Sequence, residues 1–290
     1  RVVLAELGLG LQSDEHALLK LRLLRALCAV GVGGSLALAG AMTQGLFRNP
    51  LAEPGLLGVS SGAMLGAVIA IALLGGYGPD VWTSFQAGDS AGAAAWNRMV
   101  SLGLVPALAF CGALAATLTI YRLATRHGRI SVPGLLLSGL AINALLGSLM
   151  AALQVLLLQD WQASRAIIAW GFGTFDDRSL FHIVVVWCGA FVALLGIPFV
   201  ALELDLLAGG EEDAAALGAN PARIKTVVLA CVALATAASV AVSGQIAFVG
   251  LVVPHLTRLV VGPHHRRLLP LAFLAGATLV LLFVFFQHRA

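Results

Sequence analysis

The chain has 290 residues, of which 60% are hydrophobic and 11% are charged. Soluble globular domains carry about 25% charged residues, so the composition excludes a soluble globule and indicates a polytopic membrane protein. The formal net charge of +3 is too small to favour nucleic acid as a partner. The four cysteines lie in apolar segments without CxxC spacing, and we interpret them as packing residues rather than disulfide partners or metal ligands. They are Cys28, Cys111, Cys188 and Cys231.

Eight segments are apolar over a length that crosses, or nearly crosses, a bilayer. They cover residues 26–47, 56–76, 101–121, 132–158, 180–202, 226–243, 246–261 and 268–286. Glycine is frequent, with 33 residues, which suits helices that approach one another closely in a membrane. We therefore expect an all-α, polytopic transmembrane helical bundle that forms a single domain over residues 1–290.

The basic residues of the loops lie mostly on one side of the membrane when the eight spans alternate in direction. That side collects Arg48, Arg122, Arg126, Arg129, Arg223, Lys225, Arg266 and Arg267. It is cytoplasmic by the positive-inside rule. Both ends of the chain then fall on the outer side, so we expect at least one further helix before residue 1 and another after residue 290 in the whole protein.

Residues 203–225, which we call the charged loop, separate two apolar segments and contain five acidic residues. These acids are Glu203, Asp205, Glu211, Glu212 and Asp213. Residues 210–221 are predicted to form a short helix, because acids in the first turn favour the positive end of the helix dipole and Gly218 and Pro221 end the helix. A short cytoplasmic helix between two spans can dock another protein; a simple turn of the chain is the alternative.

The two long outer loops differ in composition from the cytoplasmic ones. Residues 77–100 are rich in glycine, alanine and serine, which predicts a mobile loop or a short amphipathic helix. Residues 159–179 hold several aromatic rings, which are typical of an interfacial belt. A lip that handles a large ring-bearing solute is the alternative for this second loop.

Polar groups inside a span cost free energy unless they are paired or face water. Asn143, Gly147, Met150 and Gln154 share one face of the span 132–158, since their spacing is i, i+4, i+7 and i+11. This face is the candidate lining of a pathway. Alternatively, Asn143 and Gln154 form hydrogen bonds with neighbouring helices.

A GxSxG pattern at residues 58–62, together with His255, raises the possibility of an intramembrane serine hydrolase. No strand is predicted before the serine, and Gly58, Gly62 and Gly66 recur at the four-residue interval of closely packed helices, so we favour packing. The sequence contains neither a GxxxxGK[ST] phosphate loop nor an HExxH metal motif, and any energy source must be a gradient or another subunit. A secondary transporter would need a buried acid or a charge pair at midplane, and the spans show none.

Three blocks carry a family resemblance: residues 36–63, the charged loop, and residues 244–259 with the following 265–270. Together they strongly resemble the permease subunits of type II ABC importers, which take up vitamin B12, iron siderophores and heme. The resemblance covers nearly the whole chain. It implies a ten-span permease fold in the bacterial inner membrane with both termini cytoplasmic, of which these eight spans are the second through ninth.

The resemblance also implies partners and site residues. Such permeases form homodimers with two cytoplasmic ATPase subunits and a periplasmic binding protein; they have no catalytic residues and bind no cofactor or metal, because ATP and Mg²⁺ belong to the ATPase. The residues that it assigns are Glu211, Glu212, Leu217 and Gly218 for ATPase coupling, Arg22 and Arg25 for docking of the binding protein, and Ser131 and Val132 for the gate. The expected pathway residues are Asn143 and Gln154, from their shared helix face, and Arg178 on the outer side. Three positions depart from the family pattern, namely Leu24 for proline, Asp213 for a small residue and His264 for an acid.

The expected substrate is heme, because the chain looks nearest to bacterial heme permeases. On the outer face, Arg165, Arg178, His182 and aromatic rings would suit a flat apolar ring with two carboxylates. A ferric siderophore and vitamin B12 are the alternatives, since the same groups could pass either.

Overall fold

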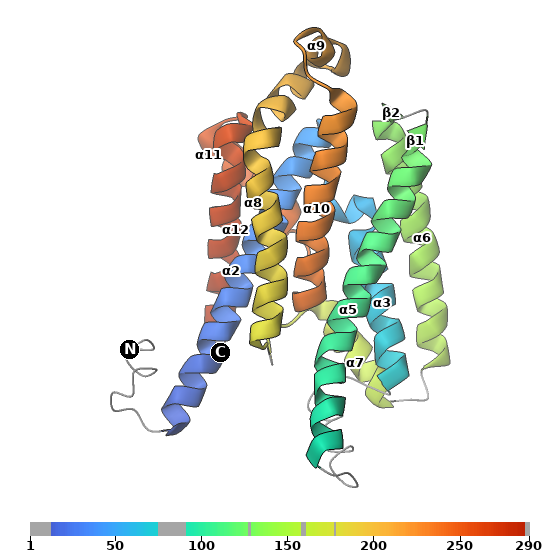
Figure 1. Cartoon of the computed structure of the whole chain (residues 1–290), viewed down its shortest axis with the longest axis vertical. Coiled ribbons are helices and arrows are strands. Elements are labelled where there is room, and N and C mark those ends of the chain that lie inside the picture. The colour runs from blue at the N-terminus through green and yellow to red at the C-terminus, as the bar shows by residue number, and fades with distance from the viewer. Residues whose placement is uncertain (1–12, 75–90, 127–128, 158–160, 177, 288–290) are drawn as a thin grey trace.

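The computed structural model of the chain describes residues 13–74, 91–126, 129–157, 161–176 and 178–287. In this part the chain is a bundle of helices with one two-stranded hairpin (Figure 1). Its elements are α2 (Ser13–Phe47), η1 (Pro54–Leu57), α3 (Val59–Leu74), α5 (Ala91–Ala124), β1 (Thr125–Arg126), β2 (Arg129–Ile130), α6 (Val132–Leu156), α7 (Trp161–Phe172), α8 (Leu180–Gly209), α9 (Glu211–Ala216), α10 (Pro221–Ser243), α11 (Val249–Val261) and α12 (His265–Gln287). The predicted all-α class is confirmed.

Each of the eight predicted apolar segments contains a helix. Among the described residues, six helices are long and apolar enough to cross a membrane, and α3 and α11 are shorter apolar helices. The loop predicted at residues 159–179 is partly wrong, because its first half is the helix α7. The predicted loop at 77–100 lies outside the described residues up to 90, and its last part begins α5.

The charged loop is shorter than predicted. Helix α8 continues to Gly209, so Glu203 and Asp205 belong to a helix and not to a connection. Asp205 has a structural reason to be there: its Oδ1 accepts a hydrogen bond of 3.0 Å from the backbone N–H of His265, the first residue of α12. The connection between the two spans is therefore residues 210–220, with α9 inside it.

Helices α2 and α10 form the centre of the bundle. α2 packs against α8, α10, α11 and α12, and residues 31–47 of α2 are all buried. In the most apolar window of α10, 78% of residues are buried, against 11% in α6. Helix α6 therefore stands at the edge of the bundle and presents most of its apolar surface to the surroundings (Figure 1).

The glycines of the GxSxG pattern pack two helices together. A Cβ atom on Gly62 would collide with the carbonyl oxygen of Gly112 in α5, and one on Gly66 would collide with that of Leu108. Backbone contact of this kind is available only to glycine. The packing interpretation of this four-residue spacing is confirmed. Beside the contact, α3, α5 and α6 line an apolar groove of about 500 Å³.

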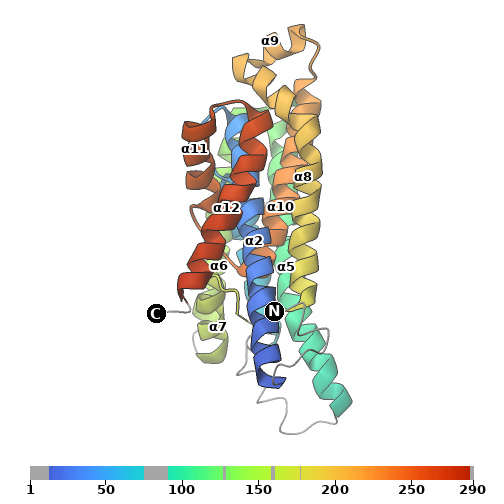
Figure 2. The ribbon, with the colours of Figure 1, turned by 90° about the vertical axis from the view of Figure 1, so that its left-hand side faces the viewer.

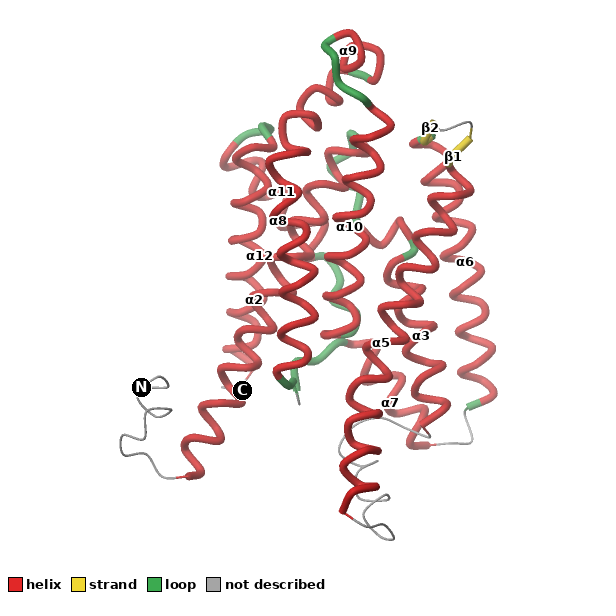
Figure 3. The backbone as a smooth tube through the Cα atoms, viewed as in Figure 1, coloured by secondary structure: helices red, strands yellow, loops and turns green. Residues whose placement is uncertain are grey.

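The connections predicted to be cytoplasmic gather at one end of the bundle. α9, the β1–β2 hairpin and the turn from α11 to α12 lie together there, while α7 and the beginnings of α2 and α8 lie at the opposite end (Figure 1). Figure 2 shows that α9 projects beyond the other helices, and Figure 3 shows how little of the described chain is loop. We call the α9 end cytoplasmic and the α7 end outer, following the distribution of basic residues.

Candidate coupling, gating and docking sites

Helix α9 is the predicted short helix of the charged loop, and it lies between two glycines. It follows Gly210, whose φ is 133°, and precedes Gly218, whose φ is 86°, a region that favours glycine. Asn220 then caps α10, because its Oδ1 accepts a hydrogen bond of 3.1 Å from the backbone N–H of Arg223. Of the four predicted coupling residues, all are exposed at this projecting tip.

A buried lysine links α9 to the rest of the cytoplasmic end. Lys225, in the first turns of α10, is only 3% exposed, and its Nζ lies 2.7 Å from Oε1 of Glu211. The same ammonium donates a hydrogen bond of 2.7 Å to the carbonyl oxygen of Ile130 in β2. A buried charge needs such partners, because an unpaired one is very costly. Glu211 therefore has an intrachain partner, in addition to the ATPase contact predicted for it.

The predicted gate residues lie between the hairpin and α6. Ser131 donates its backbone N–H to the carbonyl oxygen of Ala124 over 3.1 Å, which closes the hairpin end. Its Oγ accepts a hydrogen bond of 3.2 Å from the N–H of Gly134, so Ser131 is the N-cap of α6. Val132 is half-buried and begins the helix. These contacts make the start of α6 and the hairpin one connected unit.

Asn143 makes hydrogen bonds between helices. Its Nδ2 donates to the carbonyl oxygen of Gly55 over 3.1 Å, and its Oδ1 accepts a hydrogen bond from Oγ of Ser61. These bonds favour the packing alternative for Asn143. Gln154 is half-buried further along α6, and Gly147 between them faces open space. The pathway role of this face stays a prediction.

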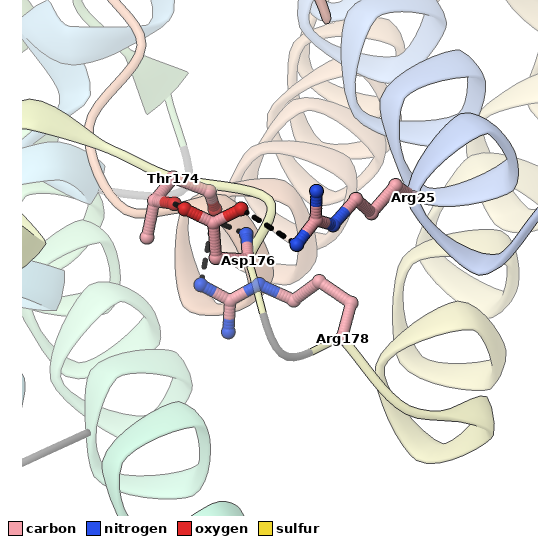
Figure 4. A network of polar contacts seen from close by, with 4 residues as sticks. All are labelled: Arg25, Thr174, Asp176 and Arg178. Carbon is pink, nitrogen blue, oxygen red and sulfur yellow. Dashed lines mark hydrogen bonds and ion pairs between the residues drawn. The ribbon is translucent and has the colours of Figure 1, made fainter. Parts of the chain in front are cut away.

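At the outer end, the two predicted docking arginines have different surroundings. Arg22 is exposed, whereas Nη2 of Arg25 lies 3.0 Å from Oδ1 of Asp176, in the connection between α7 and α8 (Figure 4). Thr174 steadies this carboxylate, since its Oγ1 donates to Oδ2 of Asp176 over 3.1 Å. The outer cation therefore already meets a carboxylate from its own chain.

The structure corrects the proposed heme contacts. Arg178 is only 5% exposed and donates its guanidinium to the carbonyl oxygen of Thr174 over 3.0 Å, so it holds the α7–α8 connection in place (Figure 4). His182 is fully buried, and its Nδ1 lies 2.9 Å from Oγ of Ser179 in the capping box of α8. Neither side chain reaches an open outer surface in this chain. Arg165 is exposed on α7, beside exposed Trp161.

The residues of the GxSxG pattern do not form a hydrolase site with His255. Ser60 offers its carbonyl oxygen to Nε2 of Gln245 over 3.2 Å, and Oγ of Ser61 bonds to Gly58 and Asn143. His255 is exposed on α11, a helix that packs on α2 and α12. Within the described residues, no group of three or more histidine, cysteine, aspartate or glutamate side chains could hold a metal ion.

No sequence pattern predicts the partners of three residues that join elements of the fold: Asp176, Asp205 and Lys225. Each meets its partner through the fold, over a separation that no local pattern shows. Oδ1 of Asp205 lies 2.6 Å from Nδ1 of His265, and Nδ1 of exposed His264 lies 4.0 Å from Oδ2. A signal exists for Lys225, because a lysine at the beginning of an apolar helix requires a partner.

The apolar helices and the projecting helix α9 indicate the class of protein, which is a helical membrane permease with a cytoplasmic contact element. Residues 2–288 match the FecCD transport family, and the chain belongs to that family. It is a permease of the type II ABC importer class, a multi-pass protein of the inner membrane and not the ATP-hydrolysing subunit.

Relatives and one solved structure support this membership. The chain is 41% identical to the cobalamin import system permease protein of Halobacterium salinarum, over 88% of this chain and 62% of that protein. It is 40% identical to the hemin transport system permease protein of Yersinia pestis, over 92% of this chain and 73% of that protein. A solved inward-facing conformation of a metal-chelate type ABC transporter matches with a TM-score of 0.74 and 28% identity, over 90% of this chain and 75% of that one. The chain thus spans 62% to 75% of the length of these proteins.

Proposed function

We propose that the chain is the membrane-spanning part of an ATP-driven importer that moves a large metal-containing solute into the cytoplasm by alternating access. The observation that carries this proposal is α9, which projects from the cytoplasmic end and is joined by Lys225 to the residues in front of α6. A helical projection of this kind can receive the movement of an ATPase and turn it into rigid-body motion of spans.

The proposed assembly contains two copies of this chain, two ATPase subunits and a periplasmic binding protein. Support for a second copy comes from α6, which is scarcely covered within one chain and carries exposed Leu137, Leu140 and Leu145. Glu211, Glu212, Leu217 and Gly218 form the proposed ATPase contact, and Arg22 with Arg25 the proposed binding-protein contact. ATP and Mg²⁺ are bound by the ATPase subunits in this proposal, and the permease contributes no catalytic group.

We propose hemin as the substrate, with cobalamin as the second candidate. The relative at 40% identity transports hemin by its name, and the exposed arginine and aromatic side chains of α7 suit a flat ring with carboxylates. The relative at 41% identity is a cobalamin permease, which favours the second candidate.

The substrate is tested with the assembled transporter in nanodiscs, by measuring how much its binding protein stimulates ATP hydrolysis when loaded with hemin, a ferric siderophore or cobalamin. Stimulation by hemin above the other two supports the first choice. Stimulation by cobalamin alone replaces hemin with the second candidate. If no loaded binding protein changes the rate and uptake needs no ATP, the importer proposal itself is wrong.

A further inference from the structure

The contacts of Lys225 join three elements at the cytoplasmic end. Its ammonium lies between the Glu211 carboxylate at the start of α9 and the Ile130 carbonyl in β2, at 2.7 Å from each. The lysine is 3% exposed and Glu211 is 46% exposed. The charge that is buried is therefore the cation, and its position is determined by both acceptors together.

The flanks of α9 make this bridge important for the orientation of the helix. Gly210 and Gly218 bracket α9 with positive φ angles, and a Cβ atom on Gly218 would meet nothing within 4 Å. When one element of a protein rotates relative to another, the φ and ψ changes occur at a few connecting residues such as these. The bond from Lys225 to the first residue of α9 restrains a short helix whose covalent connections allow it to turn.

The other side of the bridge leads to the gate region. Ile130 directly precedes Ser131, which caps α6 through Gly134 and closes the hairpin through Ala124. A displacement of Ile130 is thus carried through its peptide bond to Ser131, and from there by the Ser131 cap into the first turn of α6. The path from α9 to α6 consists of one ion pair, one charge-assisted hydrogen bond and one helix cap.

We propose that Lys225 is a positioning residue that transmits displacement of α9 to the start of α6, through Glu211 on one side and Ile130 on the other. The functional meaning of this link rests on the proposed role of α9 as the ATPase contact. The link itself is a property of the permease alone, and its test needs neither the ATPase nor a known substrate.

The test measures distances between spin labels on the permease in lipid nanodiscs. One label pair joins α9 to α6, at Ala215→Cys and Leu136→Cys, and a second joins α9 to α10, at Ala215→Cys and Ala230→Cys; all three sites are exposed. The exposed native cysteines are replaced by Cys111→Ser and Cys188→Ser. Lys225→Met, which keeps the apolar stem and removes the charge, is expected to broaden both distance distributions. Arg223→Met is the matched control, an exposed cation in the same helical turn, and should leave both unchanged.

A charge exchange separates the two halves of the link. In the double variant Glu211→Lys with Lys225→Glu the ion pair can form again, but a carboxylate at position 225 cannot donate to the Ile130 carbonyl. We expect the α9–α10 distribution to narrow again and the α9–α6 distribution to stay broad. If Lys225→Met fails to fold, Glu211→Gln, which changes a half-exposed side chain, must broaden the α9–α10 distribution.

Distributions that stay as narrow as in the unaltered chain, in Lys225→Met or in Glu211→Gln, would overturn the proposal. In the assembled transporter, Lys225→Met should also lower the number of solutes moved per ATP hydrolysed at least several-fold while ATP hydrolysis continues. Altered distances with unaltered transport per ATP would leave the link as a structural brace and contradict its transmitting role. Uptake that needs no ATP in any variant would instead contradict the proposed importer function.

Discussion

The two ends of the molecule each carry an ion pair, and the pairs differ in burial. The inner pair, Lys225 with Glu211, holds a cation that is 3% exposed, whereas in the outer pair Arg25 is 22% and Asp176 is 58% exposed. Exposed pairs contribute about 0–1 kcal/mol, because water and salt compete for both charges. Removing one partner of a buried charge is much more costly. The inner pair is therefore suited to fix the position of α9. The outer pair is suited to be replaced by a contact between Arg25 and the binding protein.

Removal of the inner carboxylate should give the largest effect on stability. Glu211→Ala leaves the buried ammonium of Lys225 with only the Ile130 carbonyl, and we expect the free energy of unfolding to fall by about 3 kcal/mol. Unfolding of the purified permease by titration with sodium dodecyl sulfate measures this. A loss below about 1 kcal/mol would show that the inner pair is no stronger than an exposed one.

Reversal of the outer cations should affect association rather than folding. Arg22→Glu together with Arg25→Glu places acids where the proposed docking surface needs cations, and we expect affinity for the binding protein to fall about tenfold or more, mainly through slower association. Surface plasmon resonance at two salt concentrations measures this. Reversal of Lys20, an exposed cation on the same helix, by Lys20→Glu is a control for net charge. Equal losses in both variants would argue against a specific role of the arginines.

Removal of the outer carboxylate should strengthen docking of the binding protein, which is the opposite of the effect of reversing the arginines. Asp176→Asn removes one carboxylate that contacts Arg25, so the binding protein should bind a few-fold more tightly, while the unfolding free energy changes by less than about 1 kcal/mol. The same binding and unfolding measurements apply. Weaker binding in this variant would mean that Asp176 orients Arg25 for docking and does not compete for it.

Salt should have the smallest effect on stability, and it should weaken only the outer ion pair. Salt screens exposed charges over a Debye length that falls from about 10 Å at 0.1 M to about 3 Å at 1 M, and it screens buried pairs much less. We expect 0.5 M sodium chloride to remove what stability the outer pair contributes, measured as the difference between Asp176→Asn and the unaltered chain. The difference for Glu211→Ala should remain. If the differences in unfolding free energy for both Asp176→Asn and Glu211→Ala disappear at high salt, the inner pair is exposed to solvent.

The apolar segments and the short helix α9 could be predicted because local sequence determines them. A bilayer requires about 20 apolar residues per helix, and acids followed by glycine and proline delimit a short helix. Lys225 and Ile130 are 95 positions apart, and their contact depends on the packing of the hairpin against α10. Nothing in the local composition shows such a partner.

The burial of Arg178 and His182 at the outer end is not predictable from the sequence for a related reason. Arg178 and His182 follow an aromatic segment, which favours an open outer face, yet the connection folds back onto the end of α10. The N–H of Thr174 donates to the carbonyl oxygen of Ser243 over 2.8 Å, and a Cβ atom on Gly173 would press on the carbonyl oxygen of Gln245. In this fold Arg178 and His182 are both buried. It requires tertiary contacts that hydropathy and charge do not report.

Transport can be measured as uptake of radiolabelled hemin, ferric siderophore and cobalamin into proteoliposomes. These proteoliposomes hold the permease with its ATPase and binding protein, so the uptake tests whether the chain is part of an ATP-driven importer. We predict that one of the three enters only when ATP is supplied on the cytoplasmic side, and that Lys225→Met lowers uptake per ATP hydrolysed while Arg223→Met does not. Uptake without ATP, or an unchanged ratio in Lys225→Met, would contradict the account.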